Sequence, residues 1–126
     1  MRFTFTKEER LKSKKLIEEL FSNKTFVQNS IIRIYFKQVT LDCAYQAQFA
    51  FAVPKKLFQH STDRNRLKRL MRESVRLQKP MLTQILQENN KQVILLLSYH
   101  AKSLHHFQEV DEAVTKLLKK VINELH

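Results

Sequence analysis

The stretch QVILLLSY, residues 92–99, is nearly continuous in valine, isoleucine and leucine. A run of this kind is typical of a strand that is buried on both faces, near the middle of a sheet. Beyond it, residues 110–125 carry apolar side chains at the i, i+3, i+4, i+7 spacing of an amphipathic helix. This pair of segments predicts a central sheet with helices packed against it.

Two earlier segments also have the pattern of strands. In residues 32–37, apolar side chains alternate with a basic and aromatic row that includes Arg33 and Tyr35, so the two rows fall on opposite faces of the sheet. Residues 45–53 form the next expected strand, with small alanines that let a helix or a ligand approach closely. Pro54 ends it, because proline cannot donate a hydrogen bond to a neighbouring strand.

Helices are expected on either side of these strands. The first has two candidate caps, Thr6, which forms a Thr-x-x-Glu capping box with Glu9, and Ser13. The second covers residues 64–77 after a cap at Thr62 or Asp63. Pro80 is expected to open a further short helix. The order helix, strands, helix, strand, helix predicts an α/β sandwich that forms a single domain over the whole chain, residues 1–126.

Composition restricts the possible functions. Cys43 is the only cysteine, so the chain can form neither an internal disulfide nor a cysteine-rich zinc site, and a reducing compartment fits. The longest apolar run, residues 93–97, is too short to span a bilayer, and the N-terminus lacks an apolar signal segment. We therefore expect a cytoplasmic protein without a membrane partner. The absence of glycine excludes the glycine-rich phosphate loops of nucleotide-binding folds.

The charge is strongly positive and unevenly distributed. The chain has 23 lysines and arginines against 12 acids, a net charge of +11, which favours a polyanionic partner. Residues 55–79 contain only two acids, Asp63 and Glu73. The same segment contains the cations Lys55, Lys56, Arg64, Arg66, Lys68, Arg69, Arg72, Arg76 and Lys79.

The helix expected over residues 64–77 has two different sides. At 100° per residue, the side expected to pack on the sheet carries Leu67, Leu70, Met71, Ser74, Val75 and Leu77. The other side carries Arg64, Lys68, Arg69, Arg72 and Arg76, with Asn65 among them. Arginine binds phosphate oxygens with its planar fork and stacks on bases. This side therefore indicates polyanion binding rather than an ordinary solvated surface.

Three segments together resemble one known family. RNRLKRLMRE, residues 64–73, resembles the signature helix of the protein subunit of bacterial ribonuclease P. Residues 7–12 are similar to the N-terminal segment of that family, and FAVPKK, residues 51–56, to the strand and lysine pair that precede the signature helix. The resemblance implies an αβββαβα fold, an α+β sandwich with a small mixed sheet. It also implies a left-handed crossover around the signature helix, although right-handed crossovers are the strong default.

The resemblance also implies a function. Ribonuclease P is an endonuclease that removes the 5′ leader of precursor tRNA, and its RNA subunit is the catalyst, acting with bound magnesium. The protein subunit binds the catalytic RNA and holds the leader in a cleft between the first helix and the sheet. The chain would therefore have no catalytic residue of its own, its partners would be the catalytic RNA and precursor tRNA, and no protein partner would be required.

Site residues follow from the resemblance position by position. The RNA-binding set would be Arg64, Asn65, Arg66, Lys68, Arg69 and Arg72, with the lysine pair Lys55 and Lys56. The leader cleft would contain Phe21 and Tyr35, and Arg33 lies in the same basic and aromatic row. Phe21 has an equally good explanation as a core contact. Asn65 matches a family position near a bound metal ion.

The sequence gives weaker support to other sites and functions. His105 and His106 are adjacent, so they cannot share a helix face as metal ligands, and Ser98 has no partner that marks it as a nucleophile. The acids Glu8 and Glu9 are expected at a helix start or an exposed face. The main alternative is a general or ribosome-associated RNA-binding α/β protein without a role in tRNA cleavage. A DNA-binding role lacks the expected helix-turn-helix partner.

Overall fold

The computed structural model describes residues 9–23, 25–40 and 45–125. In chain order these residues form α1 (Lys14–Asn23), β1 (Phe26–Gln28), β2 (Ile32–Val39), β3 (Ala47–Ala52), α2 (Ser61–Glu88), β4 (Gln92–Tyr99) and α3 (Phe107–Glu124). The order is αβββαβα, and the α+β fold expected from the sequence is confirmed. Glu8 and Cys43 lie outside the described residues.

The four strands form one mixed sheet in the order β1-β2-β4-β3. The central strand β4 pairs antiparallel with β2, with Ile34 opposite Leu97, and parallel with β3, with Phe49 opposite Leu95. Because β3 and β4 are parallel neighbours, α2 is the crossover that connects them. The left-handedness of this crossover stays a prediction from the resemblance.

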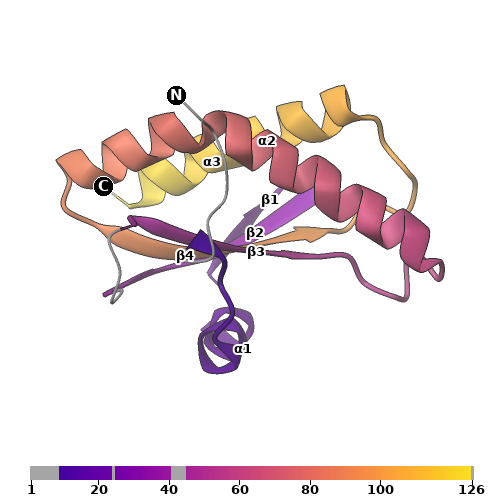
Figure 1. Ribbon diagram of the computed structural model, residues 1–126, viewed down its shortest axis with the longest axis horizontal. Coiled ribbons are helices and arrows are strands. Elements are labelled where there is room, and N and C mark those ends of the chain that lie inside the picture. The colour runs from indigo at the N-terminus through magenta and orange to yellow at the C-terminus, as the bar shows by residue number, and fades with distance from the viewer. Residues whose placement is uncertain (1–8, 24, 41–44, 126) are drawn as a thin grey trace.

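The helices lie on both faces of the sheet. Figure 1 shows α2 and α3 together on one face and α1 on the other. The main core lies beneath α2 and α3 and includes Val93, Leu95 and Leu97, whereas Ile94 and Leu96 belong to a smaller cluster with α1. The strand β4 is therefore covered on both faces, as its continuous apolar sequence predicts.

The helix α2 is longer than the sequence pattern predicts. It runs without a break from Ser61 to Glu88 with Pro80 inside it, so the expected separate helix after Pro80 is wrong. Proline removes one hydrogen bond within the helix and crowds the preceding turn. Buried side chains on both sides of the proline, Val75 before it and Leu82 and Leu86 after it, pack in the main core. This packing holds the two parts in one helix despite the local cost.

The start of α2 also differs from expectation. The N-cap is His60 and no side chain caps the helix, so the predicted caps at Thr62 or Asp63 are wrong. The Nη1 atom of Arg64 instead donates hydrogen bonds to the carbonyls of Phe58 and Gln59, at 2.8 and 2.9 Å. An arginine of the helix thus fixes the approaching loop. By contrast, Ser13, the second candidate cap of α1, is confirmed, since the amide of Leu16 donates to Ser13 Oγ at 3.3 Å. Thr6, the first candidate, lies outside the described residues.

A buried polar contact links α2 to α3 and leads to a stability prediction. Ser74 is completely buried, and its hydroxyl donates to Asp111 Oδ1 at 2.7 Å. Replacing Ser74 by alanine should lower the free energy of unfolding by about 1–3 kcal/mol, because the carboxylate loses a donor inside the helix interface. Urea unfolding measures this loss. An exposed Ser103→Ala control should change stability by less than about 0.5 kcal/mol, and equal losses in the two variants would contradict the account.

Candidate nucleic-acid interface

The cations predicted to bind RNA lie on α2 and on the turn before it. We call this set the cationic face: Lys55, Lys56, Arg64, Arg66, Lys68, Arg69 and Arg72, with the amide of Asn65. Arg64 and Lys68 are half-buried, and all the others are exposed. The helix buries Leu67, Met71 and Val75 on its opposite side. The two-sided helix expected from the sequence therefore presents its basic side to solvent.

Two residues of α2 differ from what the sequence predicts for the two sides of this helix. Leu77, placed at the edge of the apolar arc, is 46% exposed and does not belong to the core. Arg76 pairs with Glu73, its Nε donating to Glu73 Oε2 at 2.9 Å. This contact lowers the pKa of Glu73 and raises the pKa of Arg76. Arg76 is therefore a less available cation than the members of the cationic face.

Aromatic side chains from three elements meet on the α1 side of the sheet. The ring centroid of Phe21 on α1 lies 5.0 Å from that of Tyr35 on β2, and the Phe26 ring on β1 lies 5.5 Å from Tyr35. The guanidinium carbon of Arg33 lies 4.4 Å from the Phe26 centroid. We call these four residues the aromatic–arginine cluster. The structure thus brings the predicted cleft residues Phe21, Arg33 and Tyr35 together.

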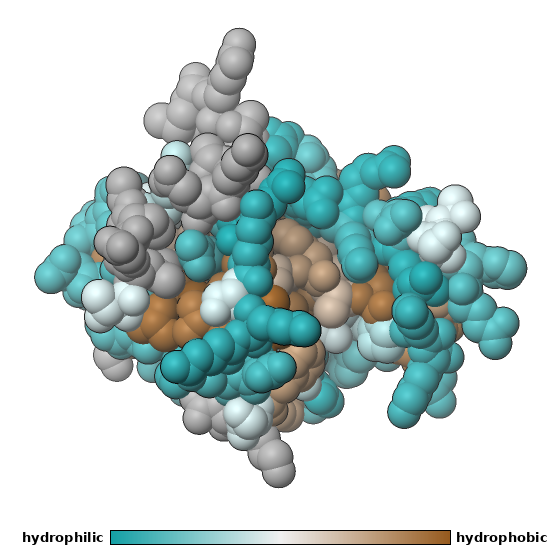
Figure 2. Space-filling view, turned by 60° about the horizontal axis from the view of Figure 1, so that its bottom comes forward, coloured by the Kyte–Doolittle hydropathy of each residue, from teal (hydrophilic) through white to brown (hydrophobic). Residues whose placement is uncertain are grey.

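Phe21 is exposed enough to serve as a contact surface. Its side chain is 47% exposed, although it touches Tyr35. The exposed part of the ring is therefore open to a partner. Figure 2, which brings the α1 side forward, shows apolar surface in a hollow bordered by hydrophilic side chains. Such a surface suits bases of a single strand, which stack on aromatic rings while their phosphates stay near cations.

Arg33 is held in place by its neighbours. Its Nε and Nη2 both donate to Gln28 Oε1, at 2.9 and 2.7 Å, and its Nη1 donates to the Tyr35 hydroxyl at 3.2 Å. An arginine has five N–H donors, so two are left over after these contacts. They have no partner among the residues that the structure describes. A fixed guanidinium with spare donors is well suited to bind a phosphate or a base edge.

Sequence reasoning missed Phe26 and Gln28. Both lie on β1, which has only three residues and is too short to show an alternating pattern. The strand is recognisable only by its pairing with β2, where Phe26 is opposite Tyr35 and Gln28 is opposite Arg33. A search for a hairpin partner of the basic and aromatic row would have found them.

The histidines and one buried acid have structural roles. His105 Nδ1 lies 3.0 Å from Glu109 Oε2, and hydrogen bonds from His105 and from the backbone of His106 lower the pKa of Glu109. His106 is the N-cap of α3. Glu9, expected at a helix start or an exposed face, is instead buried and forms an ion pair with Lys79 at 3.0 Å. The two histidines thus stabilise the start of α3, and Glu9 attaches the N-terminal segment to α2.

The described side chains do not form a metal cage. Among residues 9–23, 25–40 and 45–125, no group of three or more histidines, cysteines or acids is placed to hold a metal ion. Asn65 is exposed on α2 and supplies a single amide oxygen. Magnesium in proteins is usually held by carboxylates and substrate phosphates. The residues around Asn65 therefore do not fit a protein-borne magnesium site.

Comparison with known proteins decides the family. A family profile described as Ribonuclease P matches residues 5–122, almost the whole chain. The chain belongs to the ribonuclease P family. Ribonuclease P is a tRNA-processing endoribonuclease, and the proteins of this family are one of its subunits, with an RNA partner.

The chain is similar in sequence to individual ribonuclease P proteins along most of its length. The chain is 32% identical over 120 residues to the ribonuclease P protein component of Porphyromonas gingivalis, covering 94% of this chain and 87% of that protein. It is 28% identical over 125 residues to the protein component of Chlorobium phaeobacteroides, covering 91% and 86%.

Solved ribonuclease P structures share the fold. The ribonuclease P protein of Staphylococcus aureus superposes with a TM-score of 0.70 at 17% identity, covering 90% of this chain and 94% of that one. The ribonuclease P protein of Thermotoga maritima superposes with a TM-score of 0.64 at 22% identity, covering 89% of this chain and 96% of that one.

None of the helices formed by the described residues is both long and apolar enough to cross a membrane.

Proposed function

We propose that this chain binds the catalytic RNA of ribonuclease P through the cationic face and the 5′ leader of precursor tRNA through the aromatic–arginine cluster. The observation that carries the proposal is the placement of the two surfaces. The cationic face lies on α2, on one side of the sheet, and the cluster is built around α1 and the other side. The two surfaces can therefore contact two RNA segments at the same time.

The two surfaces would contribute different kinds of binding. Cations on α2 neutralise phosphates, and the release of condensed counterions makes this contact strong and salt-dependent. Phe21 and Tyr35 offer faces for stacking, which adds about 1–3 kcal/mol per base with little sequence preference. Arg33, fixed by Gln28, adds hydrogen-bond donors beside these rings. Together they would bind an unpaired leader that mature tRNA lacks.

We propose that cleavage itself is carried out by the RNA subunit with magnesium. When bound, magnesium would supply the activated water and stabilise charge on the phosphate. The protein would hold the leader in place, so that the scissile phosphate enters the catalytic site of the RNA. A metal at Asn65 would need RNA phosphates as its other ligands. We place this work in the cytoplasm, where bacterial precursor tRNA is made.

The leader contact makes a specific prediction. Replacing Phe21 by alanine should weaken the affinity of the reconstituted enzyme for leader-bearing precursor tRNA by about 5- to 100-fold, because one stacking surface is lost. Affinity for mature tRNA should not change. Equilibrium binding of both RNAs measures the difference. Leu104→Ala is a matched control, since Leu104 is similarly exposed, at 46%, and lies in the connection between β4 and α3, which contributes no residue to the cluster.

The same binding measurement distinguishes the proposed function from the main alternative. A general or ribosome-associated RNA-binding protein would bind leader-bearing and mature tRNA equally, and Phe21→Ala would affect both or neither. The aromatic–arginine cluster favours the leader-binding role, because a general electrostatic binder does not require a fixed arginine beside half-buried rings and one exposed ring. Equal loss for the two RNAs would reject the leader contact.

A further inference from the structure

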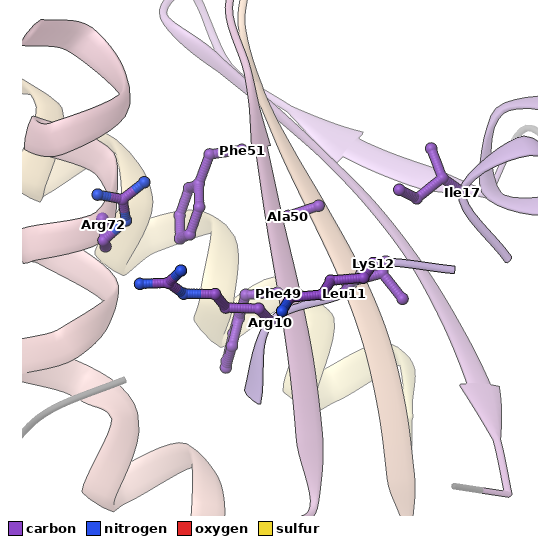
Figure 3. A pocket seen from close by; sticks show the side chains of 8 residues that line it. All are labelled: Arg10, Leu11, Lys12, Ile17, Phe49, Ala50, Phe51 and Arg72. Carbon is purple, nitrogen blue, oxygen red and sulfur yellow. The ribbon is translucent and has the colours of Figure 1, made fainter. Parts of the chain in front are cut away.

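Phe51, near the end of β3, is a half-buried aromatic side chain on the α2 side of the sheet. It packs against the main core beneath α2, whereas its neighbour Ala50 packs with the smaller cluster beside α1. Figure 3 shows the two side chains on opposite sides of the strand, as expected for consecutive residues of a strand. The Phe51 ring therefore faces the helix that carries the cationic face.

The Phe51 ring contacts one member of the cationic face. The guanidinium carbon of Arg72 lies 5.7 Å from the ring centroid, within the reach of a cation–π contact. Figure 3 shows the Arg10 guanidinium on the same side of β3, and both arginines line a cavity of about 460 Å³. Because like charges repel, this second cation favours movement of Arg72 away from the ring. The ring opposes that movement, since its negative face attracts the guanidinium.

A contact with a ring leaves the hydrogen-bond donors of an arginine unused. Arg64 donates from Nη1 to two backbone carbonyls, and Arg76 donates to the carboxylate of Glu73, so both have fewer donors for a partner. Arg72, in contrast, donates no hydrogen bond to any residue that the structure describes. The ring thus orients a guanidinium whose five N–H donors these residues leave unused.

We infer that Phe51 is a positioning residue for Arg72. The ring holds the guanidinium ready for a phosphate of the catalytic RNA, so that less side-chain entropy is lost when the RNA binds. Phe51 acts through Arg72 and not by touching the RNA. The inference rests on the proposed function, in which the cationic face binds the catalytic RNA, and it adds a residue of the sheet to that contact.

The first test changes the charge distribution of the ring and keeps its shape. Phe51 is replaced by phenylalanines with one, two or three ring fluorines, which weaken the negative face stepwise. We expect the affinity for the catalytic RNA at fixed salt to fall with each fluorine, by about 2- to 5-fold with three. The same replacements at Phe107, a half-buried residue at the start of α3, are the control and should leave the affinity unchanged.

A double-mutant cycle tests whether Phe51 acts through Arg72. Phe51→Leu keeps an apolar side chain and removes the ring, and Arg72→Gln removes the cation. We expect each single variant to weaken binding of the catalytic RNA, and Phe51→Leu to cause no further loss when Arg72→Gln is present. Additive losses would overturn the inference, because Phe51 would then act independently of Arg72. Thermal unfolding checks that the variants keep the fold, and the fluorinated proteins give the answer if Phe51→Leu does not.

The inference and the proposed function can fail separately. A triple glutamine variant of Arg66, Lys68 and Arg69 tests the RNA contact of α2 without changing the ring contact. If this variant loses affinity and the fluorinated Phe51 proteins do not, the positioning role is wrong and the RNA contact stands. Equal losses for fluorination at Phe51 and at Phe107 would also overturn the positioning role. If neither the triple variant nor fluorination changes the affinity, the proposed function fails as well.

Discussion

Replacing Arg66, Lys68 and Arg69 together by glutamine should weaken binding of the catalytic RNA about a thousandfold at moderate salt. All three belong to the cationic face, and none has an intramolecular polar partner among the residues that the structure describes. A hydrogen bond to a charged group contributes about 1.5 kcal/mol or more, so three of them account for this factor. Glutamine keeps the helix propensity close to that of lysine and arginine.

Salt dependence distinguishes a direct contact from a general charge effect. Loss of three phosphate contacts should flatten the plot of log affinity against log salt by about 2–3 units. The matched control replaces Lys116, Lys119 and Lys120 on α3 by glutamine, which removes the same charge from an exposed surface elsewhere. If both triple variants lose affinity and slope equally, α2 is not the RNA contact. Arg64 is left unchanged because it also fixes the loop before the helix.

Replacing Lys79 by methionine should lower the free energy of unfolding by about 3 kcal/mol. The side chains of Glu9 and Lys79 are 5% and 14% exposed and lie 3.0 Å apart. Removing one partner of a buried ion pair takes away the nearest compensating charge of the other, which costs about 3–5 kcal/mol. Urea unfolding gives the value. The double variant Glu9→Gln with Lys79→Met should recover part of the loss, since the buried carboxylate is then replaced by a neutral amide.

An exposed ion pair provides the comparison for this second prediction. Lys37 lies 3.4 Å from Glu19, and both side chains are 37% exposed. Exposed pairs contribute about 0–1 kcal/mol, so Lys37→Met should change the free energy of unfolding by no more than that. Equal effects of Lys79→Met and Lys37→Met would show that the contact between the N-terminal segment and α2 does not stabilise the fold.

Long and regular patterns made most of the fold predictable. The run from Val93 to Leu97 predicted a strand covered on both faces, and the apolar spacing after Val110 predicted the helix that covers one of them. Predictions from the local sequence failed where tertiary packing determines the secondary structure. Pro80 is a helix breaker by its chemistry, yet packing of Leu82 and Leu86 on the core continues α2 through it.

The candidate site was predictable in part for a similar reason. The charge of α2 is visible in the sequence, because its cations recur on one side of a helix. The aromatic–arginine cluster depends on the pairing of β1 with β2, and a three-residue strand leaves no periodic signal. The contact between the N-terminal segment and β3 depends on the bridge between Arg10 and Phe49, which are far apart in the sequence, so no local pattern reveals it.

The most direct measurement is cleavage of precursor tRNA by the catalytic RNA at limiting magnesium, with and without this chain. The account predicts that the wild-type protein raises the rate of 5′ leader removal, and that the triple glutamine variant of Arg66, Lys68 and Arg69 loses most of this effect while the α3 control retains it. A cleavage rate that the wild-type protein leaves unchanged would contradict the proposed function.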